Sequence, residues 1–219
     1  MSKQKKPVHA LSLPYPDPEW PTITSDQEQA ILSLLLPLLQ PIGAFKQDNV
    51  PRSKGKGRAG KIQTKEKETI PELYERLTIG FNSTVRRLEG LAHGQKPEVF
   101  PAVTPLPPLP DQISNLSMVL VCRRNLPDIM TSSLPLLVAT SAPLANRARL
   151  IEVSPQAGSK IAQALQQQRV GVLGIEAGAP GTETLSRFVV DTIPSVQVPW
   201  LDRPHSPTYF PVKVKTTNG

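Results

Sequence analysis

The fold is decided by a stretch that opens with SMVLVCRRNLPDIMTSSLPLLVATSA (residues 117–142), an apolar run followed by a longer mixed segment. This alternation continues to residue 201. The short apolar runs are typical of strands covered on both faces, and the segments between them are long enough for helices. The pattern predicts an α/β sandwich whose sheet is sheltered by helices. The expected strands are residues 117–122, 149–153, 170–175 and 195–201, and the expected helices are residues 127–142, 157–168 and 180–193.

An apolar segment near residue 30 predicts a helix that packs on this core. Thr24 or Ser25 has a suitable side chain for its N-cap, and Glu28 stands three residues after Ser25, as a capping box requires. Pro37 and Pro41 are expected to end the helix, because proline lacks the N–H donor of a helix interior. The apolar run is shorter than the roughly 20 residues of a membrane span, so we expect no membrane partner.

Residues 70–93 are also predicted to be helical, with Gly80 as a point where the helix kinks or restarts. An apolar stripe at helical spacing supports this interpretation. The stripe consists of Leu77, Phe81, Val85, Leu88 and Leu91.

The net charge is +7, and most of it lies in one window. Residues 46–67 hold eight Lys or Arg against two acidic residues and contain no aromatic residue. Such a segment cannot bury enough apolar surface to fold alone, so we expect a flexible basic loop. The loop suits a polyanion through salt-dependent contacts, and it fits a plain linker or a nuclear-import signal equally well. The residues expected to make contacts without sequence preference are Lys54, Lys56, Arg58 and Lys61.

Proline marks the irregular parts of the chain, with 25 of 219 residues, about twice the usual share. The sequence therefore predicts one α/β domain with irregular attachments. Its expected parts are an extended N-terminal segment (1–22), a helix on the core (23–45), the basic loop (46–69), the α/β domain (70–201) with a Pro-rich spacer (94–116), and a C-terminal tail (202–219).

The sequence offers no pattern for catalysis or metal binding. His9, His93 and His205 lie in unrelated segments, none at the spacing of metal ligands or of a catalytic pair. Cys122 sits inside an apolar run, where a buried and inert thiol is expected. The glycines of residues 171–181 fit neither dinucleotide-binding nor P-loop spacing. We expect no catalytic residue, no metal site and no cofactor.

Polar residues in two places indicate binding instead. In the second helical region, Asn and Ser each precede an Arg by four residues, and a pair of Arg follows the first strand, at a sheet end where ligands commonly approach. Asn and Arg both make paired hydrogen bonds to base edges, and Arg also holds phosphates. The residues are Asn82, Ser83, Arg86, Arg87, Arg123 and Arg124.

The segment IGFNSTVRRLE (79–89) resembles the G-x-N-E-x-x-K/R signature of the kink-turn-binding ribosomal-protein superfamily at Gly80, Asn82 and Arg86, with Ser83 in the glutamate position. Over roughly two thirds of its length, the chain is similar to the fungal POP-class protein subunits of ribonuclease P and ribonuclease MRP. The similar segments are EWPTITSDQEQAILSLLLPLLQPIG (19–43), ELY with LEGLAHG (72–94), VLVCRRNLPDIMTSSLPLL (119–137), RLIEVSPQAGSKIAQAL (149–165), RVGVLGI (169–175) and VPWL (198–201).

The resemblance implies a three-layer α-β-α sandwich and a noncatalytic protein that binds ribonuclease P RNA, ribonuclease MRP RNA and other protein subunits in the nucleus and nucleolus. Ribonuclease P removes the 5′ leader of precursor tRNA, and ribonuclease MRP cuts precursor rRNA. The superfamily's RNA-binding residues correspond here to Gly80, Asn82 and Arg86 and to a loop of Pro155, Gln156, Ala157 and Gly158.

Three other interpretations remain. The same fold and motif serve small nucleolar and ribosomal particles. A scaffold that acts mainly through protein contacts agrees with the near-neutral core and the apolar spacer. An α/β hydrolase or nucleotide-binding protein shares only the fold class.

Overall fold

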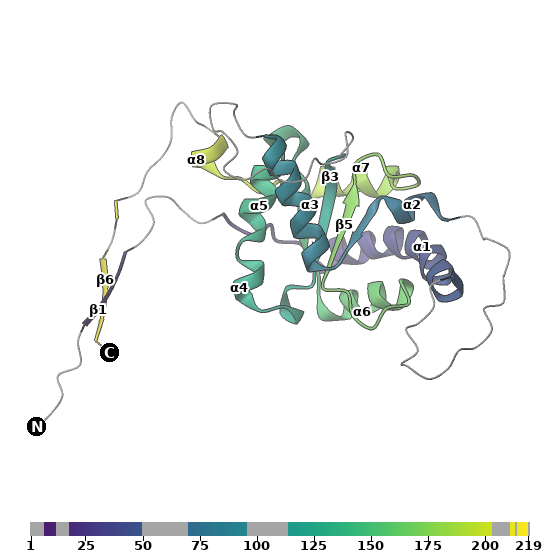
Figure 1. Ribbon diagram of the computed structural model, residues 1–219, viewed down its shortest axis with the longest axis horizontal. Coiled ribbons are helices and arrows are strands. Elements are labelled where there is room, and N and C mark those ends of the chain that lie inside the picture. The colour runs from purple at the N-terminus through teal and green to yellow at the C-terminus, as the bar shows by residue number, and fades with distance from the viewer. Residues whose placement is uncertain are drawn as a thin grey trace, which may run out of the picture. The chain divides into compact units, whose positions relative to one another are not determined.

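The computed structural model describes residues 7–11, 18–49, 70–95, 114–202, 211–212 and 214–218, and it divides into two compact units (Figure 1). The larger unit is Trp20–Val196, and the smaller one joins Met1–Glu19 with Gln197–Gly219. Most of the predicted basic loop and Pro-rich spacer falls outside the described residues. So do the four basic residues Lys54, Lys56, Arg58 and Lys61.

The larger unit is built on a four-stranded sheet in the order β2-β5-β3-β4. Strands β3 and β4 run parallel, and β5 is antiparallel to both of its neighbours. Along β3 and β5 nearly every residue is buried, as the continuous apolar runs predicted. The strands are β2 (Leu77–Ile79), β3 (Leu116–Val121), β4 (Arg149–Glu152) and β5 (Val172–Glu176).

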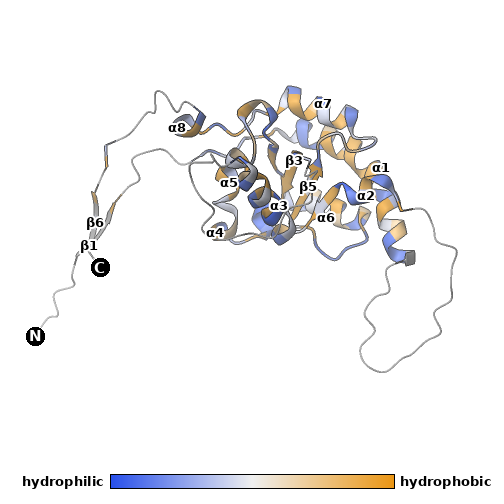
Figure 2. Cartoon of the chain, turned by 45° about the horizontal axis from the view of Figure 1, so that its top comes forward, coloured by the Kyte–Doolittle hydropathy of each residue, from blue (hydrophilic) through white to orange (hydrophobic). Residues whose placement is uncertain are grey.

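Helices cover both faces of this sheet (Figure 1). Alternate strand residues such as Met118 and Leu120 belong to a core cluster with α1 (Ser25–Asn49), α6 (Pro155–Ala164) and α7 (Glu183–Thr192). The opposite face carries α3 (Phe81–Gly94) and α5 (Leu134–Ser141), which pack on each other. Figure 2 shows the hydrophobic strands β3 and β5 between these helical layers. The predicted α/β sandwich is therefore confirmed.

Helix α1 is longer than predicted, because Pro37 and Pro41 do not end it. Ser33, Pro37 and Pro41 are spaced by four residues and are all exposed. Because proline has no N–H, Pro37 leaves the Ser33 carbonyl without its helical donor, and Pro41 does the same to the Pro37 carbonyl. Both carbonyls belong to exposed residues, so water can donate to them instead. The opposite side of α1, including Ile31 and Leu35, is at most 1% exposed. The free energy gained by burying these apolar side chains outweighs the free-energy cost of the two prolines.

Over Ser25–Gln47, helix α1 is long and apolar enough to cross a membrane. In this fold its apolar side chains pack in the core of the larger unit.

The region predicted as one helix over residues 70–93 contains a strand. The short α2 (Glu72–Glu75) is followed by β2, which pairs with β5, and α3 begins only after Gly80. The expected stripe is therefore wrong at Leu77, which lies in β2, and the buried face of α3 consists of Thr84, Leu88 and Leu91. Helical spacing could not reveal β2, because a three-residue edge strand is specified by its partner strand.

Two further predictions need correction. The helix over residues 127–142 forms as two, α4 (Asp128–Thr131) and α5, with Pro135 in the first turn of α5. Residues 195–201 form no strand and lead into the single turn α8 (Pro199–Asp202), since Pro194 before this run and Pro199 within it lack N–H donors for a ladder. Short 3-10 turns, η1 (Arg123–Asn125) and η2 (Leu144–Asn146), complete the larger unit. In the smaller unit, β1 (Pro7–Leu11) pairs antiparallel with β6 (Val214–Asn218).

Candidate nucleic-acid interface

Four segments meet where β3 ends, and backbone hydrogen bonds fix their positions. The N–H of Gly80, before α3, donates to the carbonyl of Val172, the first residue of β5 (2.8 Å). The N–H of Cys122 donates to the carbonyl of Gly171 (2.8 Å), and that of Val153 donates to the last residue of β3 (2.9 Å). The start of α3, the η1 turn, the loop after β4 and the loop before β5 therefore lie together at the end of the sheet where β3 finishes. We call this end of the sheet, formed by these four segments, the β3 edge.

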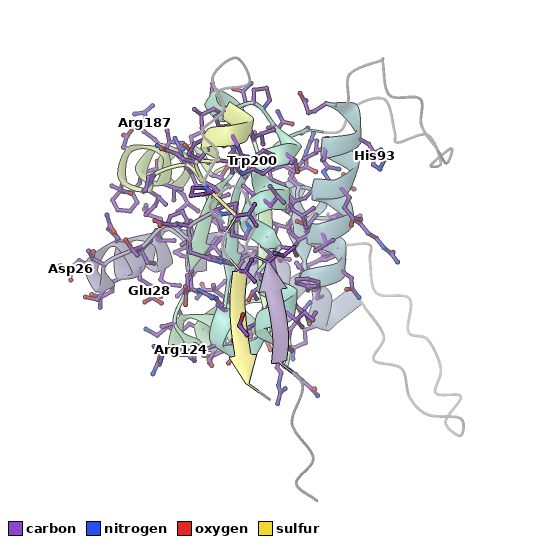
Figure 3. All side chains as sticks on the ribbon, turned by 90° about the vertical axis from the view of Figure 1, so that its left-hand side faces the viewer. Asp26, Glu28, His93, Arg124, Arg187 and Trp200 are labelled. Atoms are coloured by element: carbon purple, nitrogen blue, oxygen red, sulfur yellow. The ribbon has the colours of Figure 1, made fainter. Side chains whose placement is uncertain are left out.

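The predicted Arg pair lies in the η1 turn at the β3 edge. Arg123 Nη1 is 3.6 Å from Glu152 Oε2, and the Arg123 guanidinium carbon is 5.2 Å from the centre of the Trp20 ring. Arg124 is exposed, and its side chain is labelled in Figure 3. The two arginines thus differ: Arg123 is held between two neighbours, and Arg124 faces solvent.

Glu28 ties α1 to the loop after β4. Its Oε1 accepts hydrogen bonds from the Ser154 N–H (2.9 Å) and the Ser154 hydroxyl (2.7 Å). Ser154 in turn caps α6, since its Oγ accepts from the Ala157 N–H (3.2 Å). The capping box of α1 is therefore made by Thr24 and Gln27, whose side chains accept each other's backbone N–H (3.2 and 2.9 Å). The capping role predicted for Glu28 is wrong, because that carboxylate is committed to Ser154.

The four residues predicted as a loop form the first turn of α6, directly after the loop that follows β4, and they divide into two pairs. Pro155 and Gln156 lie at the surface, with Gln156 exposed. Ala157 and Gly158 face the interior, and a Cβ added to Gly158 would lie 3.0 Å from the Cys122 sulfur. Ala157 and Gly158 thus pack α6 closely against β3, and the RNA contact expected of them stays a prediction.

The start of α3 presents three of the predicted residues to solvent. Asn82, Ser83 and Arg86 are all exposed. Gly80, the N-cap residue, has φ +97°, a conformation that side chains disfavour. The Thr84 hydroxyl donates to the Gly80 carbonyl (3.0 Å) and fixes this turn from the buried side of the helix.

Arg87 is placed differently from the other candidates. Its Nη2 lies 2.6 Å from Glu176 Oε1 and donates to the Ser114 carbonyl (2.8 Å). Only 20% of the Arg87 side chain is exposed, and Glu176 is 8% exposed. Because Glu176 ends β5, this pair lies toward the sheet edge opposite to the β3 edge. The geometry gives Arg87 an internal role in holding Glu176, and its expected contact with RNA stays a prediction.

Cys122 is buried where η1 begins, and burial raises the pKa of its thiol. The thiol is within 3.8 Å of the Ser154 carbonyl, its acceptor. Among the residues that the structure describes, no group of three His, Cys, Asp or Glu could hold a metal ion.

The family model of RNase P subunit Pop3 matches residues 59–203, two thirds of the chain, including α3 and every strand of the four-stranded sheet. The chain belongs to this family. Membership in the Pop3 family makes it a protein subunit of RNase P, an enzyme of tRNA processing, and so implies association with that particle's RNA and other subunits. No curated protein matches the sequence.

Sequence reasoning missed two residues at the β3 edge of this Pop3-family chain. Trp20 lies in the segment predicted only as extended, and its contact with Arg123 joins residues more than a hundred positions apart. Arg169 is exposed in the loop before β5, two residues from the Gly171 carbonyl that binds Cys122. An aromatic side chain among prolines gave the only available signal for Trp20, and Tyr15 in the same segment carries the same signal.

Proposed function

We propose that this chain is a noncatalytic RNA-binding subunit of both ribonuclease P and ribonuclease MRP. In this proposal it works in the nucleus and nucleolus, supporting 5′-leader removal from precursor tRNA and the processing of precursor rRNA. One observation carries the RNA-binding part: exposed Asn82 and Arg86 of α3 and exposed Arg124 of η1 come from two segments that meet at the β3 edge.

The chemistry of these side chains suits RNA. Arg forms paired hydrogen bonds with phosphates and base edges, and the Asn amide can pair with a base edge. Ser83 supplies no carboxylate beside Asn82, so base donors lack a strong acceptor at that position. We therefore propose that this surface recognises the shape of a bent or internal-loop RNA more than a strict sequence.

The test is the affinity of the full chain for transcribed ribonuclease P RNA at physiological salt. Replacing Asn82→Ala together with Arg86→Ala should weaken binding by about 2–5 kcal/mol, at roughly 1–3 kcal/mol for each lost base contact. The matched control is Arg187→Ala, which removes an exposed charge from α7 on another surface (Figure 3) and should leave Kd nearly unchanged. An unchanged Kd for the double variant would remove the start of α3 from the interface.

A second experiment tests the particle. The tagged protein is crosslinked in its own cells, and the attached RNA is sequenced. Ribonuclease P RNA together with ribonuclease MRP RNA is the expected result. Small nucleolar or ribosomal RNA would assign the same surface to another particle, and crosslinks that avoid residues 80–87 would favour a scaffold.

A further inference from the structure

The outer side of α1 is exposed but carries no charge. No charged residue lies between Glu28 and Lys46 in the sequence. The side of a helix that meets only solvent normally carries charged side chains. We call this surface the α1 face, and it consists of the exposed residues Ser33, Pro37, Gln40, Pro41 and Ala44.

The fold buries only part of this apolar helix. Of its most apolar 18-residue window, 33% is buried. Leu34 and Leu36, which lie on α1 beside the α1 face, are only half-buried. Contiguous apolar surface that a fold leaves uncovered marks a contact with another protein or with a membrane.

A groove of about 400 Å³ borders the α1 face where α1 packs beside α6 (Figure 1). The two helices cross closely, because a Cβ on Gly43 would overlap the Ala164 carbonyl. The exposed residues that line the groove are Gln40, Ala44, Gln47, Lys160, Gln163 and Gln166. Amide side chains both donate and accept hydrogen bonds, so they suit a peptide, whose backbone also carries a donor and an acceptor.

Two backbone carbonyls of the α1 face lack their helical donors. Pro37 and Pro41 have no N–H to give to the carbonyls of Ser33 and Pro37. A partner side chain with an N–H or O–H group can bond these carbonyls in place of water.

The charge of this region favours a protein over RNA. Lys160 is the charged residue among those that line the groove. Binding of RNA depends on several Lys or Arg side chains that contact phosphates. The buried centre of a protein–protein interface is instead depleted of charge, as the α1 face is.

We propose that the α1 face and the groove beside it dock another protein subunit of the ribonuclease P particle. The occupant is an apolar, uncharged segment with N–H or O–H donors for the two carbonyls and a carboxylate that pairs with Lys160. This inference rests on the family membership, which implies other subunits, and goes beyond the proposed RNA-binding function. At 1.5 Å per residue, Gln40 lies about 18 Å along α1 from Glu28 at the β3 edge, so one chain can hold RNA and the docked subunit together.

Site-specific photo-crosslinking tests the docking surface in the assembled particle. Benzoylphenylalanine replaces Gln40 in the tagged full chain, produced in its own cells, and the matched control carries it in place of the exposed Thr184 of α7. After irradiation the particle is purified through the tag and treated with ribonuclease, and the adducts are identified by mass spectrometry. We expect position 40, and not position 184, to crosslink to a protein subunit that copurifies with ribonuclease P RNA.

Added charge provides the second arm. Gln40→Glu together with Ala44→Glu should lower recovery of that subunit with the tagged chain by roughly tenfold or more, because an unpaired charge buried in an interface strongly disfavours association. Gln40→Asn, which stays uncharged, should retain the subunit. The matched control, Thr184→Glu with Val190→Glu, adds the same charge to exposed residues of α7 and should change recovery little.

Kd for ribonuclease P RNA and the circular dichroism spectrum are measured for each purified variant, and both should stay near those of the unmodified chain. Crosslinks from position 40 to RNA or to a second copy of this chain would overturn the proposal. Flotation of the purified full chain with phosphatidylcholine–phosphatidylserine vesicles would assign the α1 face to a membrane and overturn it too, as would full recovery of the subunit with the charged variant. If that variant fails to fold, the crosslink from position 40 decides.

The outcomes separate this proposal from the proposed function. A docked subunit together with an unchanged Kd for the Asn82 and Arg86 variant would leave the docking surface standing and remove the start of α3 from the RNA interface. Tight RNA binding without a protein crosslink from position 40 would do the reverse.

Discussion

Replacing Arg87 should destabilise the fold without affecting RNA binding. Arg87→Met keeps the aliphatic stem of the side chain but removes the partner of a carboxylate that is only 8% exposed. Breaking a buried ion pair from one side costs about 3–5 kcal/mol. Because a fifth of the Arg87 side chain is exposed and Arg76 remains beside Glu176, we expect a smaller loss of unfolding free energy, about 2–3 kcal/mol.

Arg76→Met is the matched control, since it removes the other arginine of the same carboxylate. Arg76 lies 3.1 Å from Glu176 Oε2, but half of its side chain is exposed, so water screens the pair. Such a pair contributes about 0–1 kcal/mol.

The assay is urea unfolding of the full chain, followed by far-ultraviolet circular dichroism at pH 7, with Kd for ribonuclease P RNA measured in parallel. Equal losses of stability in Arg87→Met and Arg76→Met would refute the reasoning from burial. A raised Kd with unchanged stability for Arg87→Met would return Arg87 to the interface and refute its internal role.

Three other changes have defined outcomes. Replacing the four basic-loop residues by Gln should reduce the slope of log Kd against log salt by roughly 0.7 per residue that contacts RNA, with no change in RNA preference; a changed preference would make the loop a specificity element. Gly80→Ala should cost about 1–3 kcal/mol in urea unfolding because φ is +97° there, whereas Gly94→Ala, at a glycine with no positive φ and open space around it, should cost little; equal effects would contradict this. A thiol reagent at pH 8 should label Cys122 slowly in the native chain and rapidly in urea, because burial raises the thiol pKa. The unfolding free energy should also fall as the pH rises above the ordinary thiol pKa, since the unfolded chain loses that proton first; fast labelling of the native chain would contradict both expectations.

The strands β3, β4 and β5 and the helices α6 and α7 could be predicted because each carries its own pattern. Strand β3 is apolar at nearly every position since helices cover both of its faces, and α6 and α7 begin near the predicted positions. The prediction was wrong where tertiary contacts decide the outcome. Helix α1 continues through Pro37 and Pro41 because its other side is buried, and β2 is specified by its pairing with β5.

The candidate site was predictable only in part, for a related reason. Sequence gives residue types and spacing, which identified Asn82 and Arg86 as exposed helix residues. It does not show what a side chain meets, and Arg87 at the next position meets Glu176, 89 residues away. The contact of Trp20 with Arg123 is equally remote in sequence, so no local pattern could reveal it.

The position of α1 also bears on where the autonomous folding unit begins. The family match starts at residue 59, after α1 has ended, although α1 closes one side of the sheet. A protein trimmed to residues 59–203 would expose the apolar surface now covered by Ile31, Leu35, Leu39 and Ile42, each at most 1% exposed in the whole fold. It would also lose the carboxylate that holds Ser154. The region that the family model matches is thus shorter than the region that forms the core, and we expect a stable fragment of this protein to begin before α1.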